Sequence, residues 1–280
     1  MRNKMLRIVA AILSITTFSP SSAATKYETY IDSAEYYAGK EQFSKAAEYY
    51  RMALRSNPAS PLNSMVFANL GLCLTETGNY SDAIEAYDVA LVKSPRSAVI
   101  LTNRAKTLIL ASKPSEALES LERAIEIEPA DITARRLHGQ LLLMDNRPKE
   151  ALDDFKTVLD QTADDPSSID GAARCHALLG NHQEAARLYR RRIEVLDEPE
   201  SHIGLITALI NDSQLDEADQ CVYNAIDLYP RNGELYLLRG IIHNLHYRTQ
   251  EAITDRKTAI TLGVPAEIAN RAIPGTLPKK

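Results

Sequence analysis

The sequence predicts an all-α fold made of tandem repeats of two helices. One motif recurs along the chain. It begins with a small residue, usually alanine, and has a larger residue four positions later. A second small residue often follows after three more positions. The first alanines of successive copies lie 37, 34, 34, 34, 33 and 34 residues apart, starting from Ala46. A fixed period near 34 indicates a stacked repeat array. Only 11 of the 280 residues are glycine, and Ala, Leu, Glu and Arg dominate, which favours helices.

Each copy of this motif predicts one packing face. Steps of four and three residues place side chains on the same side of a helix. A small side chain lets two helix backbones approach closely, and the larger one fills the wider gap beside it. The expected packing positions are Ala46, Tyr50, Ala53, Gly71, Ala83, Tyr87, Ala90, Ala117, Ala124, Ala151, Ala185, Ala218, Ala225, Ala252 and Ala259.

Each period is expected to hold two helices. In the second repeat the first helix covers 63–78 and ends at Gly78, because glycine is the usual residue after a helix C-terminus. The second helix covers 80–94 and stops before Pro95. In the next two repeats Pro114 and Pro148 stand where the second helix begins, a position that tolerates proline.

This pattern resembles the tetratricopeptide repeat family. Gly71, Ala83, Tyr87, Ala90 and Pro95 match signature positions of one repeat, and the resemblance extends from residue 27 to about 265. It implies a right-handed superhelical solenoid whose concave groove is lined by the first helix of each repeat. Within a repeat domain of 25–265, the expected repeats are 27–63, 64–97, 98–131, 132–165, 166–198, 199–232 and 233–265.

The two ends of the chain differ from the repeats. Residues 1–24 run from a basic to an apolar and then to a small, polar segment, as a secretory signal peptide does. Cleavage is expected after Ala23 or Ala24, which predicts an exported protein, periplasmic if bacterial and otherwise secreted. The alternative is an uncleaved anchor; no later stretch is long enough for a membrane helix. Residues 266–280 are expected to form a short capping helix and a tail.

Charge and cysteine content narrow the classes of partner. The net charge is −5, and loss of Arg2, Lys4 and Arg7 with the signal peptide makes it −8. An acidic surface argues against nucleic acid as a partner. The chain has three cysteines, which we interpret as small core residues, although an odd number also permits an intermolecular disulfide.

The sequence contains no recognisable catalytic motif, so neither an enzyme, a cofactor nor a metal site is predicted. His243 and His246 are three residues apart and can meet on a helix face, but no carboxylate ligand stands beside them. The adjacent pairs Asp153–Asp154 and Asp164–Asp165 point in different directions on a helix. We interpret them as solvated surface.

The family resemblance implies a binding groove with polar side chains at its middle. Asn and Gln can bond the backbone of an extended peptide, and cations can hold a carboxylate. Apolar residues such as Met65, Leu72, Ile203 and Leu237 flank them, and a plain solvated face is the alternative interpretation. The candidate groove residues are Asn69, Asn103, Lys106, Arg136, Gln140 and Arg174.

The leading hypothesis is an exported protein–protein interaction scaffold or adaptor that binds a partner polypeptide in this groove. A second hypothesis is a structural or self-assembling component of a cell-envelope complex, including a homodimer formed through the first repeat. That repeat has no helix before it and holds the six tyrosines Tyr27, Tyr30, Tyr36, Tyr37, Tyr49 and Tyr50. An enzyme without a recognisable motif is the remote third alternative.

Overall fold

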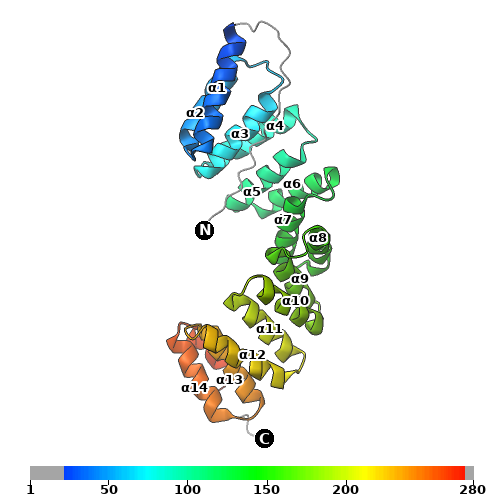
Figure 1. The fold of residues 1–280 in the computed structure, drawn as a ribbon, viewed down its shortest axis with the longest axis vertical. Coiled ribbons are helices and arrows are strands. Elements are labelled where there is room, and N and C mark those ends of the chain that lie inside the picture. Colours follow the sequence, from blue (N-terminus) through cyan, green and yellow to red (C-terminus); the bar gives the residue numbers. More distant parts are fainter. Residues whose placement is uncertain (1–21, 275–280) are drawn as a thin grey trace. The chain divides into compact units, whose positions relative to one another are not determined.

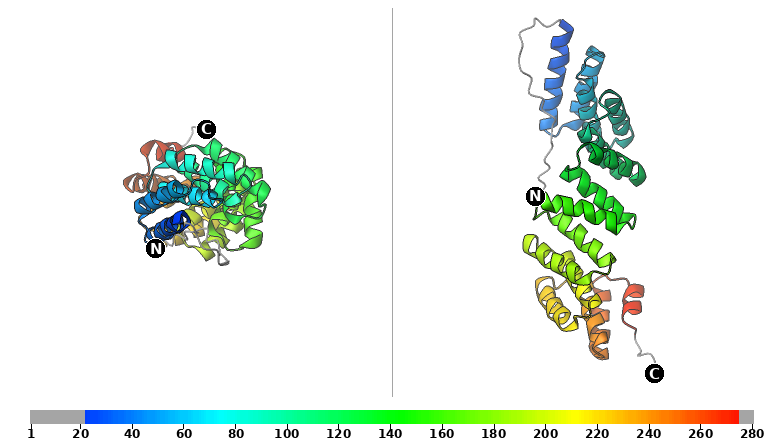
Figure 2. Two further views of the ribbon diagram at one scale, coloured as in Figure 1. Left: turned by 90° about the horizontal axis from the view of Figure 1, so that it is seen from above. Right: turned by 90° about the vertical axis from the view of Figure 1, so that its right-hand side faces the viewer.

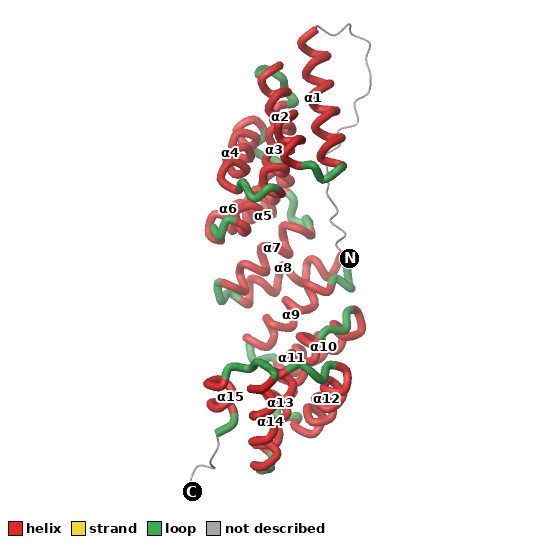
Figure 3. Tube along the Cα trace, turned by 90° about the vertical axis from the view of Figure 1, so that its left-hand side faces the viewer, coloured by secondary structure: helices red, strands yellow, loops and turns green. Residues whose placement is uncertain are grey.

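A computed structural model describes residues 22–274, and over this range the chain forms fifteen helices and no strand (Figures 1 and 3). The described residues divide into two compact units, with the division between His138 and Gly139. The boundary falls inside α7 (Ile132–Met144). The expected signal peptide lies almost wholly outside the described residues; α1 begins at Ser22. Over residues 22–274, no helix is both long and apolar enough to cross a bilayer.

The first unit is a stack of antiparallel helix pairs. Each helix packs against the next one from α1 to α6, and the first helices of neighbouring pairs, α3 and α5, also touch. Figures 1 and 2 show these helices following one another in chain order. The helices before α7 are α1 (Ser22–Gly39), α2 (Phe43–Ser56), α3 (Asn63–Glu76), α4 (Tyr80–Lys93), α5 (Ala98–Leu110) and α6 (Pro114–Ile127).

The second unit repeats this arrangement and ends in a short helix. The first helices of its pairs, α9, α11 and α13, touch in succession. The helix α15 packs on α13 and α14, and it buries Ala269 and the residue after its end, Ile273. The helices after α7 are α8 (Pro148–Gln161), α9 (Pro166–Leu178), α10 (His182–Val195), α11 (Pro199–Asn211), α12 (Leu215–Leu228), α13 (Gly233–Leu245), α14 (Thr249–Thr261) and α15 (Ala266–Ala272).

A left-handed residue closes the turn inside every helix pair. These residues have φ between 57° and 80° and recur with the period of the sequence motif. Only two of them are glycines, although such a conformation costs an ordinary residue roughly 1–2 kcal/mol. The positions are Glu41, Gly78, Ser112, Asn146, Gly180, Ser213 and Tyr247.

Rings packed on glycines fill the space between helices. A Cβ atom on Gly71 would lie 2.9 Å from Cζ of Tyr87, and one on Gly204 would lie 2.4 Å from Cε1 of Tyr189. Phe155 lies between two glycines, Gly139 and Gly171, whose Cβ atoms would lie 3.0 and 2.4 Å from its Cζ atom. Each ring therefore occupies room that a side chain on the facing helix would need. All of the expected packing alanines, Tyr50, Tyr87 and Gly71 are buried.

Two surface and core interpretations need correction. Asp153 is exposed, but Asp154 is buried, because it lies on the same helical stripe as the packing residues Ala151 and Val158. Cys221 is only half-buried. Cys73 and Cys175 are buried and free, and burial raises the pKa of both thiols to about 12, so they are poor nucleophiles at neutral pH.

Candidate functional site

A hollow of about 310 Å³ opens between α3 and α5 in the first unit. Asn69 on α3 and Asn103 on α5 both contribute to it, so the structure brings together two of the candidate groove residues. The other lining residues are Pro61, Leu62, Ser64, Met65, Ala68, Leu72, Ser94, Ser97, Val99 and Ile100. Its volume is in the range of ligand pockets in proteins, roughly 300–1,000 Å³.

The polar groups of this hollow are not equally available. The Ser64 hydroxyl donates to the carbonyl oxygen of Ala90 over 3.0 Å, and Ser97 caps α5 by accepting from the amide of Ile100. Asn69 is buried beside Tyr50: burial raises the pKa of this tyrosine, and a hydrogen bond from Asn69 opposes the shift. Asn103 is half-buried, and its side-chain amide makes no hydrogen bond within residues 22–274. Asn103 is therefore the amide that is free for a ligand.

The remaining candidate residues do not line this hollow. Lys106 is exposed on α5, one helical turn after Asn103, and Arg136 is half-buried on α7. Gln140 and Arg174 belong to the second unit and are exposed. Arg174 lies 4.0 Å from Asp170, one turn earlier on α9. The six expected residues thus include one pair, Asn69 and Asn103, in a shared hollow.

Polar pairs also link neighbouring helices, and the sequence motif did not indicate them. In the first unit, Arg104 donates from Nε to Asp88 and from Nη1 to Ser120, both over 2.7 Å. In the second unit, Arg239 forms a fork on Asp255, with distances of 3.0 and 2.6 Å. In both cases the partners lie sixteen residues away in sequence. This recurring offset is the signal that would have revealed the pairs.

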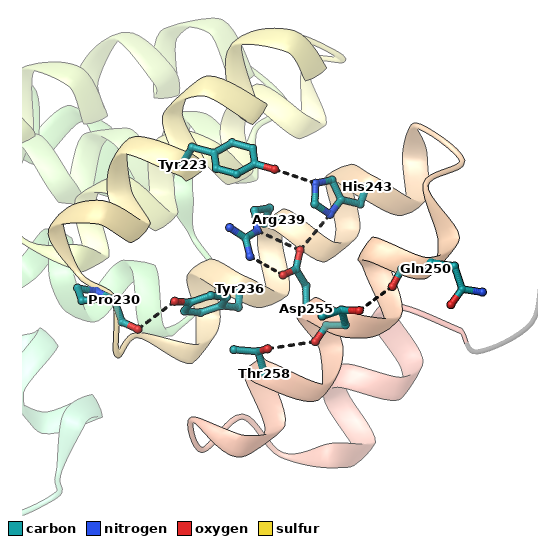
Figure 4. A network of polar contacts seen from close by, with 9 residues as sticks. Tyr223, Pro230, Tyr236, Arg239, His243, Gln250, Asp255 and Thr258 are labelled. Atoms are coloured by element: carbon teal, nitrogen blue, oxygen red, sulfur yellow. Dashed lines mark hydrogen bonds and ion pairs between the residues drawn. The ribbon is translucent and has the colours of Figure 1, made fainter.

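Figure 4 shows the pair in the last repeat as part of a closed network. The Arg239 guanidinium lies over the rings of Tyr223 and Tyr236, 5.1 Å from each centroid. His243 Nδ1 lies 3.0 Å from Asp255, and its Nε2 lies 3.2 Å from the Tyr223 hydroxyl. Hydrogen bonding to Asp255 raises the pKa of Arg239. Because these side chains contact one another across α12, α13 and α14, the network stabilises the packing of these helices.

Metal-binding side chains do not gather in the described part of the chain. Among residues 22–274, no group of three or more His, Cys, Asp and Glu side chains suits a metal ion. His243 faces Asp255 and Tyr223, as described above, and His246 follows the end of α13.

The tyrosines of the first repeat mostly pack on one another. Tyr37 and Tyr49 stack with centroids 5.3 Å apart, and Lys45 lies 5.3 Å over the Tyr37 ring. Tyr27 and Tyr50 are buried. Only Tyr36 is strongly exposed, at 60%. The expected aromatic surface for self-association therefore reduces to this ring and the edges of its neighbours.

Comparison with known proteins identifies the repeat family. Residues 31–98 and 102–166 match the tetratricopeptide repeat family. No curated protein compared with the chain matches it. A solved tetratricopeptide repeat protein from Parabacteroides merdae is 24% identical, with a TM-score of 0.63, over 89% of this chain and 98% of its own. The structure of pilF from Pseudomonas aeruginosa is 21% identical, with a TM-score of 0.61, over 77% and 97%.

A third solved structure, YrrB, is described as a TPR protein with an unusual peptide-binding site. It is 20% identical, with a TM-score of 0.55, and the match covers 67% of this chain and 97% of YrrB. Likeness at such identities shows a shared fold. The match to the family over residues 31–98 and 102–166, with the helix pairs and the ring-on-glycine packing, shows that this chain belongs to the tetratricopeptide repeat family.

Proposed function

We propose that this protein is an exported scaffold that binds a segment of a partner polypeptide in the hollow between α3 and α5. The observation that carries the proposal is the position of Asn103, a half-buried amide without a partner in the described structure, in a hollow with apolar walls. An amide can both donate to and accept from the backbone of an extended peptide. Apolar walls from Met65, Leu72 and Val99 would take its side chains.

Two further points support this reading. YrrB, which shares the fold, is described as having a peptide-binding site. Lys106 follows Asn103 by one helical turn, so a cation stands near one edge of the hollow. Such a cation favours a carboxylate or another acidic group at one end of the bound segment.

A random peptide library displayed on phage tests the proposal, with two matched variants as selectors. Val99→Arg places a long charged side chain in the hollow. Val92→Arg makes the same change on α4 at a position that is 84% exposed and does not line it. We expect the parent and Val92→Arg to enrich the same peptides and Val99→Arg to lose them. If the parent and both variants enrich the same peptides equally, or if the parent enriches none, the hollow is not the binding site.

Charge reversal tests the cationic edge separately. Lys106→Glu combined with Arg136→Glu should weaken binding of an enriched peptide by about tenfold or more, which corresponds to about 1.4 kcal/mol. Lys106 is exposed, so Lys106→Glu alone should leave the thermal unfolding midpoint nearly unchanged, because surface substitutions rarely alter stability by more than about 0.5 kcal/mol. Unchanged affinity would show that these cations do not take part.

Export is tested by the mature amino terminus. Expression of the full chain in a bacterium, fractionation and terminal sequencing should yield a protein that begins at Ala24 or Thr25. Full-length protein that begins at Met1 and stays with the membrane in high salt would instead support the uncleaved anchor.

The exposed ring of Tyr36 keeps self-assembly as a second candidate. Light scattering on the mature protein would show a dimer if this candidate holds, and Tyr36→Ala should then convert it to a monomer. A parent protein that is monomeric at all concentrations would exclude it.

A further inference from the structure

A second hollow, of about 470 Å³, lies in the second unit, where α15 follows the last repeat. Its walls come from α11, α13, the turn after α14, and α15. The lining residues are Glu200, Ile203, Asn232, Gly233, Glu234, Leu237, Leu238, Leu262, Gly263, Val264, Pro265 and Ile268.

The two hollows occupy corresponding places on their helices but differ in chemistry. In the first, the second residue of each contributing repeat is apolar, Met65 and Val99. In the second, the corresponding residues are carboxylates, Glu200 and Glu234. The amide-lined hollow is neutral, and the one beside α15 is acidic at its edge.

Both carboxylates are available to a ligand. Glu200 and Glu234 are exposed, and neither side chain forms a hydrogen bond or an ion pair within residues 22–274. The lining includes no lysine and no arginine.

The floor of the hollow is apolar. Ile203, Leu237 and Leu238 are half-buried, and Ile268 on α15 is exposed. Leu237 also packs on the buried cluster of Ala259, Val264 and Ala269, which fixes this wall. Burying apolar surface here would contribute roughly 25 cal/mol per Å², and the flanking carboxylates would favour cations beside the apolar contact.

We propose that this second hollow binds a basic, apolar segment of a partner protein, with one or more leucine-like side chains on the floor and Lys or Arg beside Glu200 and Glu234. Because the lining residues all lie within 200–268, this site is separate from the one between α3 and α5. It can exist whether or not the first hollow binds a peptide.

Short fluorescein-labelled peptides provide the test. One alternates Leu and Lys, and its matched partners alternate Leu with Gln and Leu with Glu. Fluorescence anisotropy with the mature protein should show the Leu–Lys peptide binding about tenfold or more tightly than the Leu–Gln peptide, a difference of at least about 1.4 kcal/mol. The Leu–Glu peptide should not bind, and added salt should narrow the gap. Equal affinities for Leu–Lys and Leu–Gln would overturn the proposal.

Two double variants of equal charge locate the site. Glu200→Gln with Glu234→Gln removes the carboxylates of the hollow. Asp216→Asn with Glu251→Gln removes two exposed acids from the first turns of α12 and α14, outside it. We expect about a tenfold loss for the first pair and no change for the second. Equal losses would mean general attraction to an acidic protein and would overturn the proposal.

Two further variants complete the design. Ile268→Ser should weaken binding of the Leu–Lys peptide without lowering the helix content. An unchanged affinity would show that α15 is not part of the site. Truncation after Pro274 removes a tail that contains Leu277, Lys279 and Lys280. Unchanged affinity supports an external partner, whereas a gain of about tenfold or more would assign the hollow to this tail and overturn the proposal. Val99→Arg should leave this binding intact, which separates the two hollows.

Discussion

Replacement of Asp255 by alanine is expected to be the most damaging single polar change in the second unit. Asp255 is 4% exposed at its side chain and accepts two hydrogen bonds from Arg239, which is 19% exposed. Removing one member of a buried ion pair typically costs about 3–5 kcal/mol, because the other charge stays buried without a partner. Arg239 keeps its two tyrosine rings and some solvent, so we expect about 3 kcal/mol, at the lower end of this range.

Two comparisons show whether the stranded charge causes the loss. Asp88→Ala removes a similar contact, 2.7 Å from Arg104, but Asp88 is 50% exposed, so the loss should stay below about 1 kcal/mol. The double change Arg239→Met with Asp255→Leu removes both buried charges. It should be close to neutral or stabilising, because a well-packed apolar pair can replace a buried ion pair.

Urea unfolding followed by circular dichroism, with hydrogen exchange of α13 and α14, measures these effects. Hydrogen exchange is needed because the repeats of an array can open locally before the whole chain unfolds. Faster exchange in α13 and α14 should accompany Asp255→Ala. The explanation is wrong if Asp255→Ala lowers the free energy of unfolding by less than about 1 kcal/mol. It is also wrong if the double variant loses as much stability as the single one, because the double variant leaves no buried charge without a partner.

Three other substitutions test the packing, the turns and a partly buried carboxylate. Gly171→Ala should destabilise the protein by about 1–3 kcal/mol, since the new methyl group would lie 2.4 Å from the Phe155 ring. Gly39→Ala is the control: the space around Gly39 is open, so the urea midpoint should not fall. Tyr247→Gly should raise the midpoint, by up to about 1 kcal/mol, because glycine adopts the left-handed conformation without strain; a lower midpoint would contradict this. Burial raises the pKa of Asp170, so the folded protein binds this proton more readily than the unfolded chain, whose reference value is 3.8. The contribution to stability is complete below that value and is lost as pH rises through the folded pKa. Asp170→Asn should therefore raise the urea midpoint at pH 7 more than at pH 3, and equal shifts at both would contradict the burial argument.

The helices were predictable because their signals are local. The alternation of small and large residues fixes one face of each second helix, and proline and glycine mark helix ends. Pro114 and Pro148 begin α6 and α8, and Gly78 has the left-handed conformation that follows α3. These features depend on neighbours within one helical turn or one repeat. The sequence period therefore reports them directly.

The site was only partly predictable, because a groove position does not determine a side chain's partners. Asn69 and Asn103 stand at corresponding places, yet the first is buried against Tyr50 and the second is open in the hollow. The helix periodicity gives the face on which a residue lies. It does not show whether the side-chain amide of that residue is already hydrogen-bonded to a tyrosine of the preceding helix pair.

The polar pairs join helices in two different ways. At corresponding positions of their helices, Leu70 and Leu205 are apolar, whereas Arg104 and Arg239 are charged. Each arginine meets an acid on a second helix, Asp88 in one case and Asp255 in the other. Asp255 belongs to the same helix pair as Arg239, so this buried contact holds α14 against α13 and does not depend on which pair lies beside it. Arg104 and Asp88 belong to neighbouring helix pairs, but Asp88 is 50% exposed, so losing this contact would cost less than about 1 kcal/mol. The contact between pairs therefore favours one order of stacking only weakly, and the buried contact stabilises its own pair.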